Sequence, residues 1–154
     1  MSNSTQYADR QMIADGLRLW FQPGDVFEIR VLNAMTAGYM PPHTESGYFD
    51  YEHIPEAAEA IGKIRYFTGA YATVNPVNPD LLARACNRIR AVKNDPTTSD
   101  TDIAERRWLL IDCDPERVSG VSSSDAEHDA ALAKARALRD GLAPIGWPEP
   151  VMLT

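Results

Sequence analysis

The segment RRWLLIDCDPER, residues 106–117, sets the architecture that we expect for this chain. The apolar run at 108–111 predicts a strand covered on both faces, because it leaves no polar side for solvent. Side chains alternate along a strand that rises about 3.3 Å per residue, so Asp112 and Asp114 are expected on one face, about 6.6 Å apart at Cα. Pro115 cannot donate to a continuing ladder, and the strand is therefore expected to end just after the two acids.

Two carboxylates at the end of a buried strand can close on one divalent cation. Mg²⁺ prefers hard oxygen ligands, and two-metal phosphoryl-transfer sites hold their ions about 3.5 to 4 Å apart. The sequence therefore suggests Asp112 and Asp114 as ligands of Mg²⁺ or Mn²⁺. The alternative is an ordinary loop in which Asp112 caps a turn and Asp114 simply precedes a proline.

Length and composition bound the class of protein. The 154 residues suit one domain, and 44% hydrophobic and 24% charged residues are ordinary for a globular chain. A membrane protein is not indicated, because no apolar run approaches the roughly 20 residues of a spanning helix, and the polar start lacks signal-peptide features. We therefore expect a cytoplasmic protein. The formal charge of −7 argues against a generally basic nucleic-acid-binding surface.

The two cysteines, Cys86 and Cys113, have no Cys-x-x-Cys spacing. Neither a disulfide framework nor a zinc site is indicated, and both thiols are expected to be reduced core residues.

Periodicity and turn residues predict the other elements. Helices are expected over 7–21, from Pro55 to Ile64, from 78 to 92 and over 124–142, and strands over 26–31, 69–74 and from 150 onward. Residues 33–50, rich in Gly and Pro, predict a loop or a weakly paired hairpin. The alternating order of elements predicts an α/β (α+β) fold, a mixed sheet with flanking helices.

Four segments then occur in a specific order and spacing: YATVNPV at 71–77, TTSDTDI at 97–103, RWLLIDCDP at 107–115 and SDAE at 124–127. Together they resemble the archaeo-eukaryotic primase superfamily, and more narrowly the primase-polymerase catalytic domains of plasmid, phage and mobile-element replication proteins. The likeness runs from Gly69 to the last residue.

This resemblance implies a DNA primase/polymerase-type nucleotidyltransferase. It places divalent metal and the incoming triphosphate on Asp112 and Asp114, and it implies nucleoside triphosphates, a DNA template and a replicative helicase domain as partners. Arg117, Arg107 and Asn75 are the expected nucleotide- or phosphate-binding residues. For the arginines the alternative is a salt bridge to nearby acids.

The family pattern is incomplete in this sequence. The Ser-Gly-x-Gly-x-His segment that follows in the family does not occur, nor does its later metal-binding acid, and the histidines, at 43, 53 and 128, stand in no matching motif. We therefore expect residues 1–154 to be the N-terminal portion of a primase-polymerase catalytic domain, inactive alone and prone to self-association through an incomplete sheet.

Two other classes remain open. A non-catalytic remnant could act as a nucleotide- or partner-binding module in mobile-element replication. A haloacid dehalogenase-type phosphatase fits less well, because that family has Thr or Val where Glu116 stands, and sugar-nucleotide transferases lack the surrounding motifs.

Overall fold

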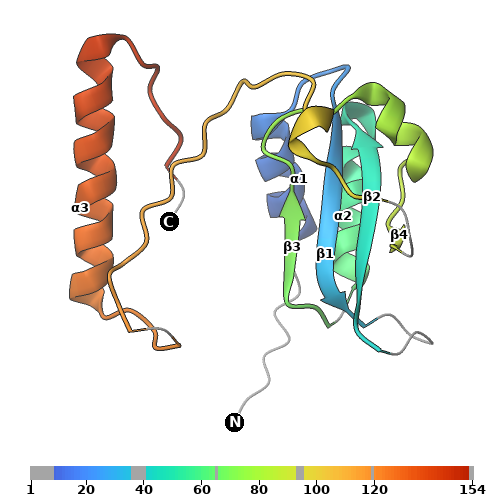
Figure 1. The fold of residues 1–154 in the computed structure, drawn as a ribbon, viewed down its shortest axis with the longest axis horizontal. Helices are drawn as coiled ribbons and strands as arrows, with labels where there is room; N and C mark the ends of the chain where they lie inside the picture. The colour runs from blue at the N-terminus through green and yellow to red at the C-terminus, as the bar shows by residue number, and fades with distance from the viewer. Residues whose placement is uncertain (1–8, 36–40, 65, 93–95, 119, 153–154) are drawn as a thin grey trace. The chain divides into compact units, whose positions relative to one another are not determined.

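The computed structural model describes residues 9–35, 41–64, 66–92, 96–118 and 120–152. The chain divides into two compact units, Met1–Leu109 and Leu110–Thr154. The first holds a four-stranded sheet with flanking helices, and the second holds one long helix (Figure 1). The expected α/β class is therefore confirmed. No helix in the described part of the chain is long and apolar enough to cross a membrane.

The sheet of the first unit is antiparallel, with the strand order β3-β1-β2-β4 (Figure 1). Its strands are β1 (Val26–Ala34), β2 (His43–Asp50), β3 (Gly69–Ala72) and β4 (Arg90–Ala91). The central strand β1 forms the predicted element over 26–31 and extends beyond it. The predicted strand over 69–74 is present as the shorter β3.

Strand β1 is largely buried on both faces, although charged residues alternate with apolar ones along it, a pattern that favours one polar face. Phe27, Ile29 and Val31 join the main core on one side, where Phe27 stacks on Phe21 with ring centroids 4.5 Å apart. On the opposite side Glu28 is only 1% exposed. A charged residue in an alternating pattern usually marks solvent, but this one is buried with its partners.

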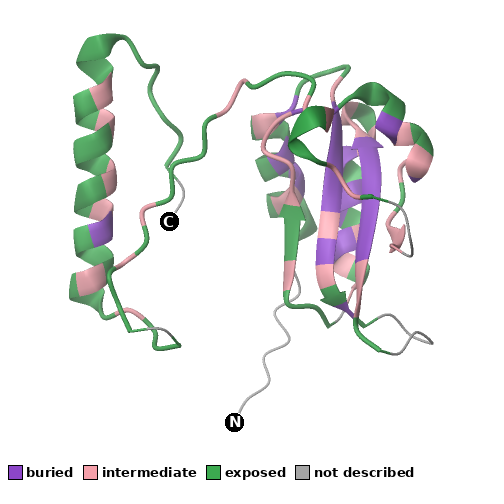
Figure 2. Cartoon of the chain, viewed as in Figure 1, coloured by how far each residue is buried: buried purple, intermediate pink, exposed green. Residues whose placement is uncertain are grey.

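Two helices complete the main core against the sheet. They are α1 (Arg10–Trp20) and α2 (Ile54–Lys63), close to their predicted bounds, although residues 7 and 8 lie outside the described chain. Asp9 caps α1 by accepting hydrogen bonds from the backbone of Gln11 and Met12. Figure 2 shows the buried residues concentrated in the two central strands and on the helix faces.

Of the two alternatives for residues 33–50, a loop or a weakly paired hairpin, the described residues form the hairpin, with strand β2 over His43–Asp50. This strand pairs with β1 from Asp50 opposite Val26 to His43 opposite Ala34. Gly47 provides space for a neighbouring chain segment, since a Cβ there would lie 2.0 Å from the carbonyl oxygen of Arg88. The glycine that favoured a turn therefore marks a close backbone approach inside a sheet.

The prediction of one helix over 78–92 is wrong for the residues that follow Arg84. Asn78 does cap a helical segment, but this is the short 3₁₀ helix η2 (Pro79–Arg84), and β4 follows. The backbone of residues 85–87 bonds to β2 instead, because Tyr48 donates to the carbonyl of Ala85 and accepts from the N–H of Asn87. Asn87 also has a φ of +51°, which a continuing helix cannot contain.

The strand predicted over 108–111 is also wrong. No strand is assigned to these residues, and Leu109, Leu110 and Ile111 are 64%, 73% and 48% exposed. An apolar run becomes a buried strand only when neighbouring strands pair with it, and the described residues provide none here. The strand expected from residue 150 is likewise not formed over 150–152, and the final two residues lie outside the described chain.

The second unit contains the helix that the sequence specified best, α3 (Asp125–Leu142). Ser124 and Glu127, spaced as the sequence pattern S-x-x-E requires, form a capping box in which each side chain bonds the other's backbone N–H. Its apolar stripe is less covered than expected, since Ala131 is buried but Leu138 is 40% exposed.

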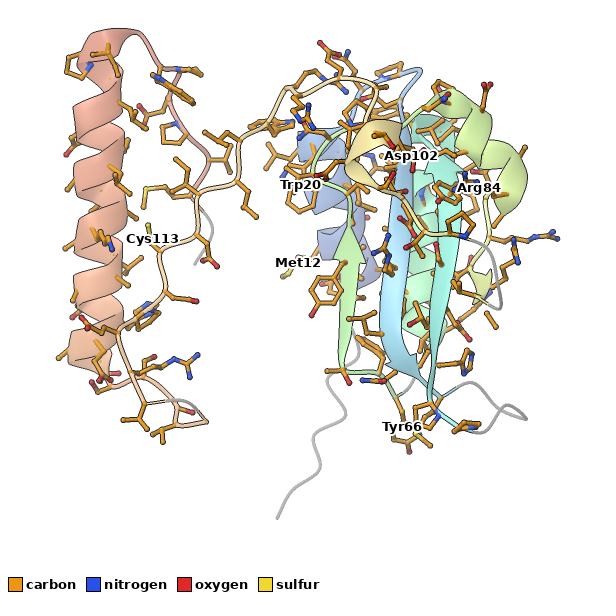
Figure 3. All side chains as sticks on the ribbon, in the orientation of Figure 1. Met12, Trp20, Tyr66, Arg84, Asp102 and Cys113 are labelled. Carbon is orange, nitrogen blue, oxygen red and sulfur yellow. The ribbon has the colours of Figure 1, made fainter. Side chains whose placement is uncertain are left out.

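Neither cysteine is a core residue, contrary to expectation. Both thiols are free, Cys86 is exposed, and Cys113 is half-buried in an extended segment of the second unit (Figure 3).

Candidate functional site

The predicted metal ligands Asp112 and Asp114 lie in an extended segment of the second unit. Both are exposed, and neither has a hydrogen-bond or ion-pair partner among the described residues. No group of three or more His, Cys, Asp or Glu in the described chain is arranged to hold a metal ion. The pair nevertheless offers hard oxygen donors of the kind that Mg²⁺ and Mn²⁺ accept. Water or ligand phosphates would have to complete the coordination.

Arg107, an expected phosphate-binding residue, is engaged within the first unit. Its guanidinium forms an ion pair with Asp25, and its Nε lies 3.5 Å from a carboxylate oxygen of Glu105. The side chains of Arg107 and Asp25 are 20% and 13% exposed. The pairing with Glu105 is the salt bridge weighed as an alternative, whereas Asp25 was not anticipated. A phosphate would have to compete with these carboxylates for Arg107.

Asn75 is engaged as well. Its Oδ1 accepts hydrogen bonds from the backbone N–H groups of Arg107 and Trp108, both at 2.8 Å. Its Nδ2 donates to the carbonyl of Trp108 at 3.0 Å. The indole of Trp108 donates in turn to the carbonyl of Trp20, the last residue of α1 (Figure 3). Asn75 therefore anchors the start of the RWLLIDCDP segment to the first unit.

The remaining expected phosphate contact, Arg117, belongs to the second unit. It is exposed and donates from Nη1 to the carbonyl of Val121 at 2.6 Å. This hydrogen bond is to a neutral carbonyl. After the hydrogen bonds from Ser124, the charge of Arg117 also helps to lower the pKa of Glu127, a residue of the α3 capping box.

Two of the four family-like segments, and the first three residues of a third, meet in the first unit. YATVNPV and TTSDTDI are joined by backbone hydrogen bonds, from Asn78 to the carbonyl of Asp102 at 2.7 Å and from Ala104 to the carbonyl of Pro76 at 2.9 Å. RWLLIDCDP joins them through Asn75. Asp102 lies on η3 (Asp100–Asp102), where its carboxylate accepts from the backbone of Ser99 (Figure 3).

A pocket of about 490 Å³ lies where these segments meet β1. The side chains that give it charge and hydrogen-bonding capacity include Glu28, Arg30, Tyr71, Thr98, Asp100 and Arg106. Glu28 and Arg30 lie on the face of β1 opposite the main core. The sequence indicated the segments of this pocket but missed these two residues. Their spacing of two on a strand, with opposite charges, is the signal that could have found them.

Glu28 is a buried carboxylate with a full set of donors. Its Oε2 accepts from Arg30 Nη2 at 2.8 Å and from the backbone of Thr98 at 3.1 Å. Its Oε1 accepts from Arg30 Nε at 3.3 Å and from Ser46 Oγ at 2.5 Å. Burial raises the pKa of Glu28, but the hydrogen bonds from Arg30, Ser46 and Thr98 outweigh it and bring the pKa below the ordinary value of 4.5. Glu28 is therefore ionised at neutral pH.

Arg30 is held with one edge open. Nε and Nη2 bond to Glu28, and Nη2 also donates to the carbonyl of Thr98 at 3.2 Å. Nη1 has no hydrogen-bond partner among the described residues, and the Arg30 side chain is 33% exposed. The neighbouring Arg106 also lines the pocket, is exposed and has no ion-pair partner among the described residues.

Comparisons of this chain with protein-family models, with curated proteins and with solved structures find no match.

Proposed function

We propose that this chain is part of a DNA primase/polymerase-type nucleotidyltransferase that binds Mg²⁺ or Mn²⁺ and a nucleoside triphosphate through Asp112 and Asp114. The observation that carries the proposal is that both carboxylates are exposed and unpaired in the described chain. Because no described group neutralises them, the oxygens of both carboxylates are available to a cation, and a cation bound between them would also relieve their mutual repulsion. The family-like segments of the sequence give the chemical class.

In the proposed reaction, a hydroxyl of a primer or initiating nucleotide forms a bond to the α-phosphorus of a nucleoside triphosphate. The bond from that phosphorus to the bridging oxygen breaks, pyrophosphate leaves, and the hydroxyl proton passes to solvent. The metal would supply neutralisation of the charge that builds on the phosphate oxygens. Asp112 and Asp114 would hold it, and Arg117 could contact the phosphates through its remaining N–H groups.

The proposed partners are nucleoside triphosphates, a DNA template and a replicative helicase domain, in the cytoplasm. Residues 1–154 alone are proposed not to synthesise primers, because the sequence has no Ser-Gly-x-Gly-x-His segment. Losing one charge-stabilising donor commonly reduces the rate by about 10² to 10³.

The second candidate is a binding module without catalysis. It is favoured by the lack of a third metal-ligating side chain near the pair within the described residues. Such a module would bind metal and nucleotide. It would not incorporate nucleotides in an Asp112-dependent way, even in a longer chain that carries the Ser-Gly-x-Gly-x-His segment.

Calorimetric titration with Mn²⁺ tests the metal site directly. Asp112→Asn combined with Asp114→Asn is expected to abolish binding. Asp125→Asn combined with Asp129→Asn removes two exposed carboxylates from the same unit and makes the same change in net charge, so it should leave binding intact. Equal affinity in the two double variants would reject the metal assignment.

Templated incorporation of nucleotides then separates the two candidates. The proposal expects none from residues 1–154, and synthesis that Asp112→Ala abolishes from a chain carrying the missing motif. Metal binding without synthesis from either chain would favour the binding module.

A further inference from the structure

We propose that the pocket over β1 is a metal-independent binding site for a nucleoside phosphate. Arg30 and Arg106 would contact the phosphate, Tyr71 would stack on the base, and Asp100 would accept hydrogen bonds from ribose hydroxyls. The site lies within the first unit and does not use Asp112 or Asp114. It is therefore a second ligand site beyond the proposed metal pair.

The first argument is that Arg30 is held in place before any ligand arrives. Glu28 fixes its guanidinium through Nε and Nη2, and the Arg30 side chain lines the pocket and is 33% exposed. Ordering a flexible side chain on binding costs about 0.5 to 1.5 kcal/mol. A guanidinium already fixed by a buried carboxylate avoids most of this cost, and its planar donors suit phosphate oxygens.

The second argument concerns the charge that the pocket presents. Glu28 is covered by donors from Arg30, Ser46 and Thr98, so its negative charge is already compensated. Arg106 brings a second guanidinium with no carboxylate partner among the described residues. The lining also contains Asp100, so its two arginines and two carboxylates balance in formal charge. A phosphate is favoured because Arg106 is exposed and Arg30 is 33% exposed, whereas Glu28 is buried.

The third argument is the position of Tyr71. It stands directly opposite Arg30 in the pairing of β3 with β1, and residues so paired share one face of the sheet. It lines the pocket and is 56% exposed. An exposed aromatic ring beside a phosphate-binding arginine is an arrangement that stacks nucleobases, since every base has a π face.

The size and the remaining polar group agree with this ligand. About 490 Å³ lies within the range of about 300 to 1,000 Å³ found for small-molecule sites. Asp100 is exposed on the lining, and no described side chain bonds its carboxylate. A carboxylate would repel phosphate but accepts hydroxyl donors, so it suits the sugar between the base and the phosphate.

The test is calorimetry with adenosine 5′-triphosphate in excess EDTA, on the Asp112→Asn and Asp114→Asn background. Binding is expected, and Arg106→Ala and Tyr71→Ala should each raise Kd about tenfold or more, the first because a charged contact is lost and the second because stacking is lost. Arg136→Ala and Tyr66→Ala remove an exposed arginine and an exposed tyrosine outside this pocket and should leave Kd unchanged. Arg30 is a poor target, because its removal leaves the buried Glu28 uncompensated.

Adenosine and inorganic triphosphate identify the parts of the ligand that are recognised. Each is expected to bind more weakly than the nucleotide. Tyr71→Ala should raise the Kd of adenosine, and Arg106→Ala should raise the Kd of triphosphate. Equal binding of triphosphate and nucleotide, insensitive to Tyr71→Ala, would overturn the nucleoside assignment. Binding of single-stranded oligonucleotide without mononucleotide would also overturn it.

Failure of this site is distinguishable from failure of the metal pair. If nucleotide binds only with Mn²⁺ and only when Asp112 and Asp114 are intact, the pocket proposal is wrong while the proposed function stands. If nucleotide binds in EDTA but Mn²⁺ does not bind the wild-type chain, the pocket stands and the metal assignment fails.

Discussion

The side-chain amide of Asn75 holds the backbone of Trp108, 33 residues later, accepting from its N–H at 2.8 Å and donating to its carbonyl at 3.0 Å. The same Oδ1 accepts from the N–H of Arg107. A side chain therefore uses the backbone groups with which a strand would otherwise begin. The predicted strand at 108–111 is replaced at its start by an anchored, irregular segment.

Asn75→Ala is expected to destabilise the first unit by about 2 to 4 kcal/mol, because two partly buried N–H groups and a carbonyl lose their partner. Asn78→Ala is the matched control, since Asn78 makes one such bond, to the backbone of Asp80 at 3.0 Å, and should cost about 1 kcal/mol. Urea unfolding followed by tryptophan fluorescence measures both. Equal stability of the two variants would show that the Asn75 bonds contribute little.

Breaking the Arg107–Asp25 pair is expected to cost about 1 to 3 kcal/mol in either Arg107→Gln or Asp25→Asn, less than for a fully buried pair. The double variant should cost less than the sum, because the interaction can be lost only once. Urea unfolding of the four proteins gives the coupling energy. If Arg107→Gln instead weakened nucleotide binding without changing stability, Arg107 would be a phosphate contact.

Gly47→Ala should destabilise the sheet by several kcal/mol, because the new Cβ would meet the backbone carbonyl of Arg88 at 2.0 Å and backbone cannot rotate away. Gly16→Ala is the opposite case, an exposed position inside α1 with nothing within 4 Å of the added atom. It should raise stability by about 0.5 to 1 kcal/mol. Thermal unfolding of both variants should therefore shift in opposite directions, and a shared direction would contradict the close approach at Gly47.

The contact of His53 with Asp50 predicts a pH dependence of stability. The hydrogen bond to Asp50 raises the pKa of His53 above its ordinary 6.5. The protonated ring is therefore favoured in the folded state, so this contribution is full below pH 6.5 and is lost as pH rises through the higher folded pKa. The stability difference between the wild-type chain and His53→Gln should shrink from pH 6 to pH 8. A constant difference would contradict this linkage.

The pKa of Asp50 determines the pH below which the contact between His53 and Asp50 no longer stabilises the fold. Burial raises its pKa, but hydrogen bonds from His53 and Asn87 outweigh burial and lower the pKa below 3.8. The stabilisation is therefore present above pH 3.8 and is lost as pH falls through the lower folded pKa.

Local signals predicted α3 and α1 well, because a capping box and an apolar stripe at helical spacing are properties of neighbouring residues. The segment 108–111 was mispredicted because burial of a strand depends on partners elsewhere in the chain. The helix prediction is wrong at residues 85–87 for the same reason, because their backbone groups bond to β2. Glu28 suggested a solvent face, and only its contacts with Arg30 and the distant Thr98 explain its burial.

The candidate site was predictable in part. The family-like segments were visible in the sequence, and two of them line the pocket. The opposite charges of Glu28 and Arg30 were visible as well, but their place in the pocket was not, because it depends on the pairing of β1 with β3 and on the approach of the 97–103 segment. Asp112 and Asp114 were identified as chemistry-bearing residues, and their metal binding stays a prediction.

The central place of β1 also has a kinetic consequence. Its contact with β2 closes a short hairpin, whereas the bond from Thr98 to Glu28 spans 70 residues. Because the entropy cost of closing a loop grows with its length, the hairpin should form early and the Thr98 segment should dock late. Substitutions at Phe49 should then slow folding, while Thr98→Ala should mainly accelerate unfolding. The wall of the pocket would therefore assemble after the hairpin and open before it.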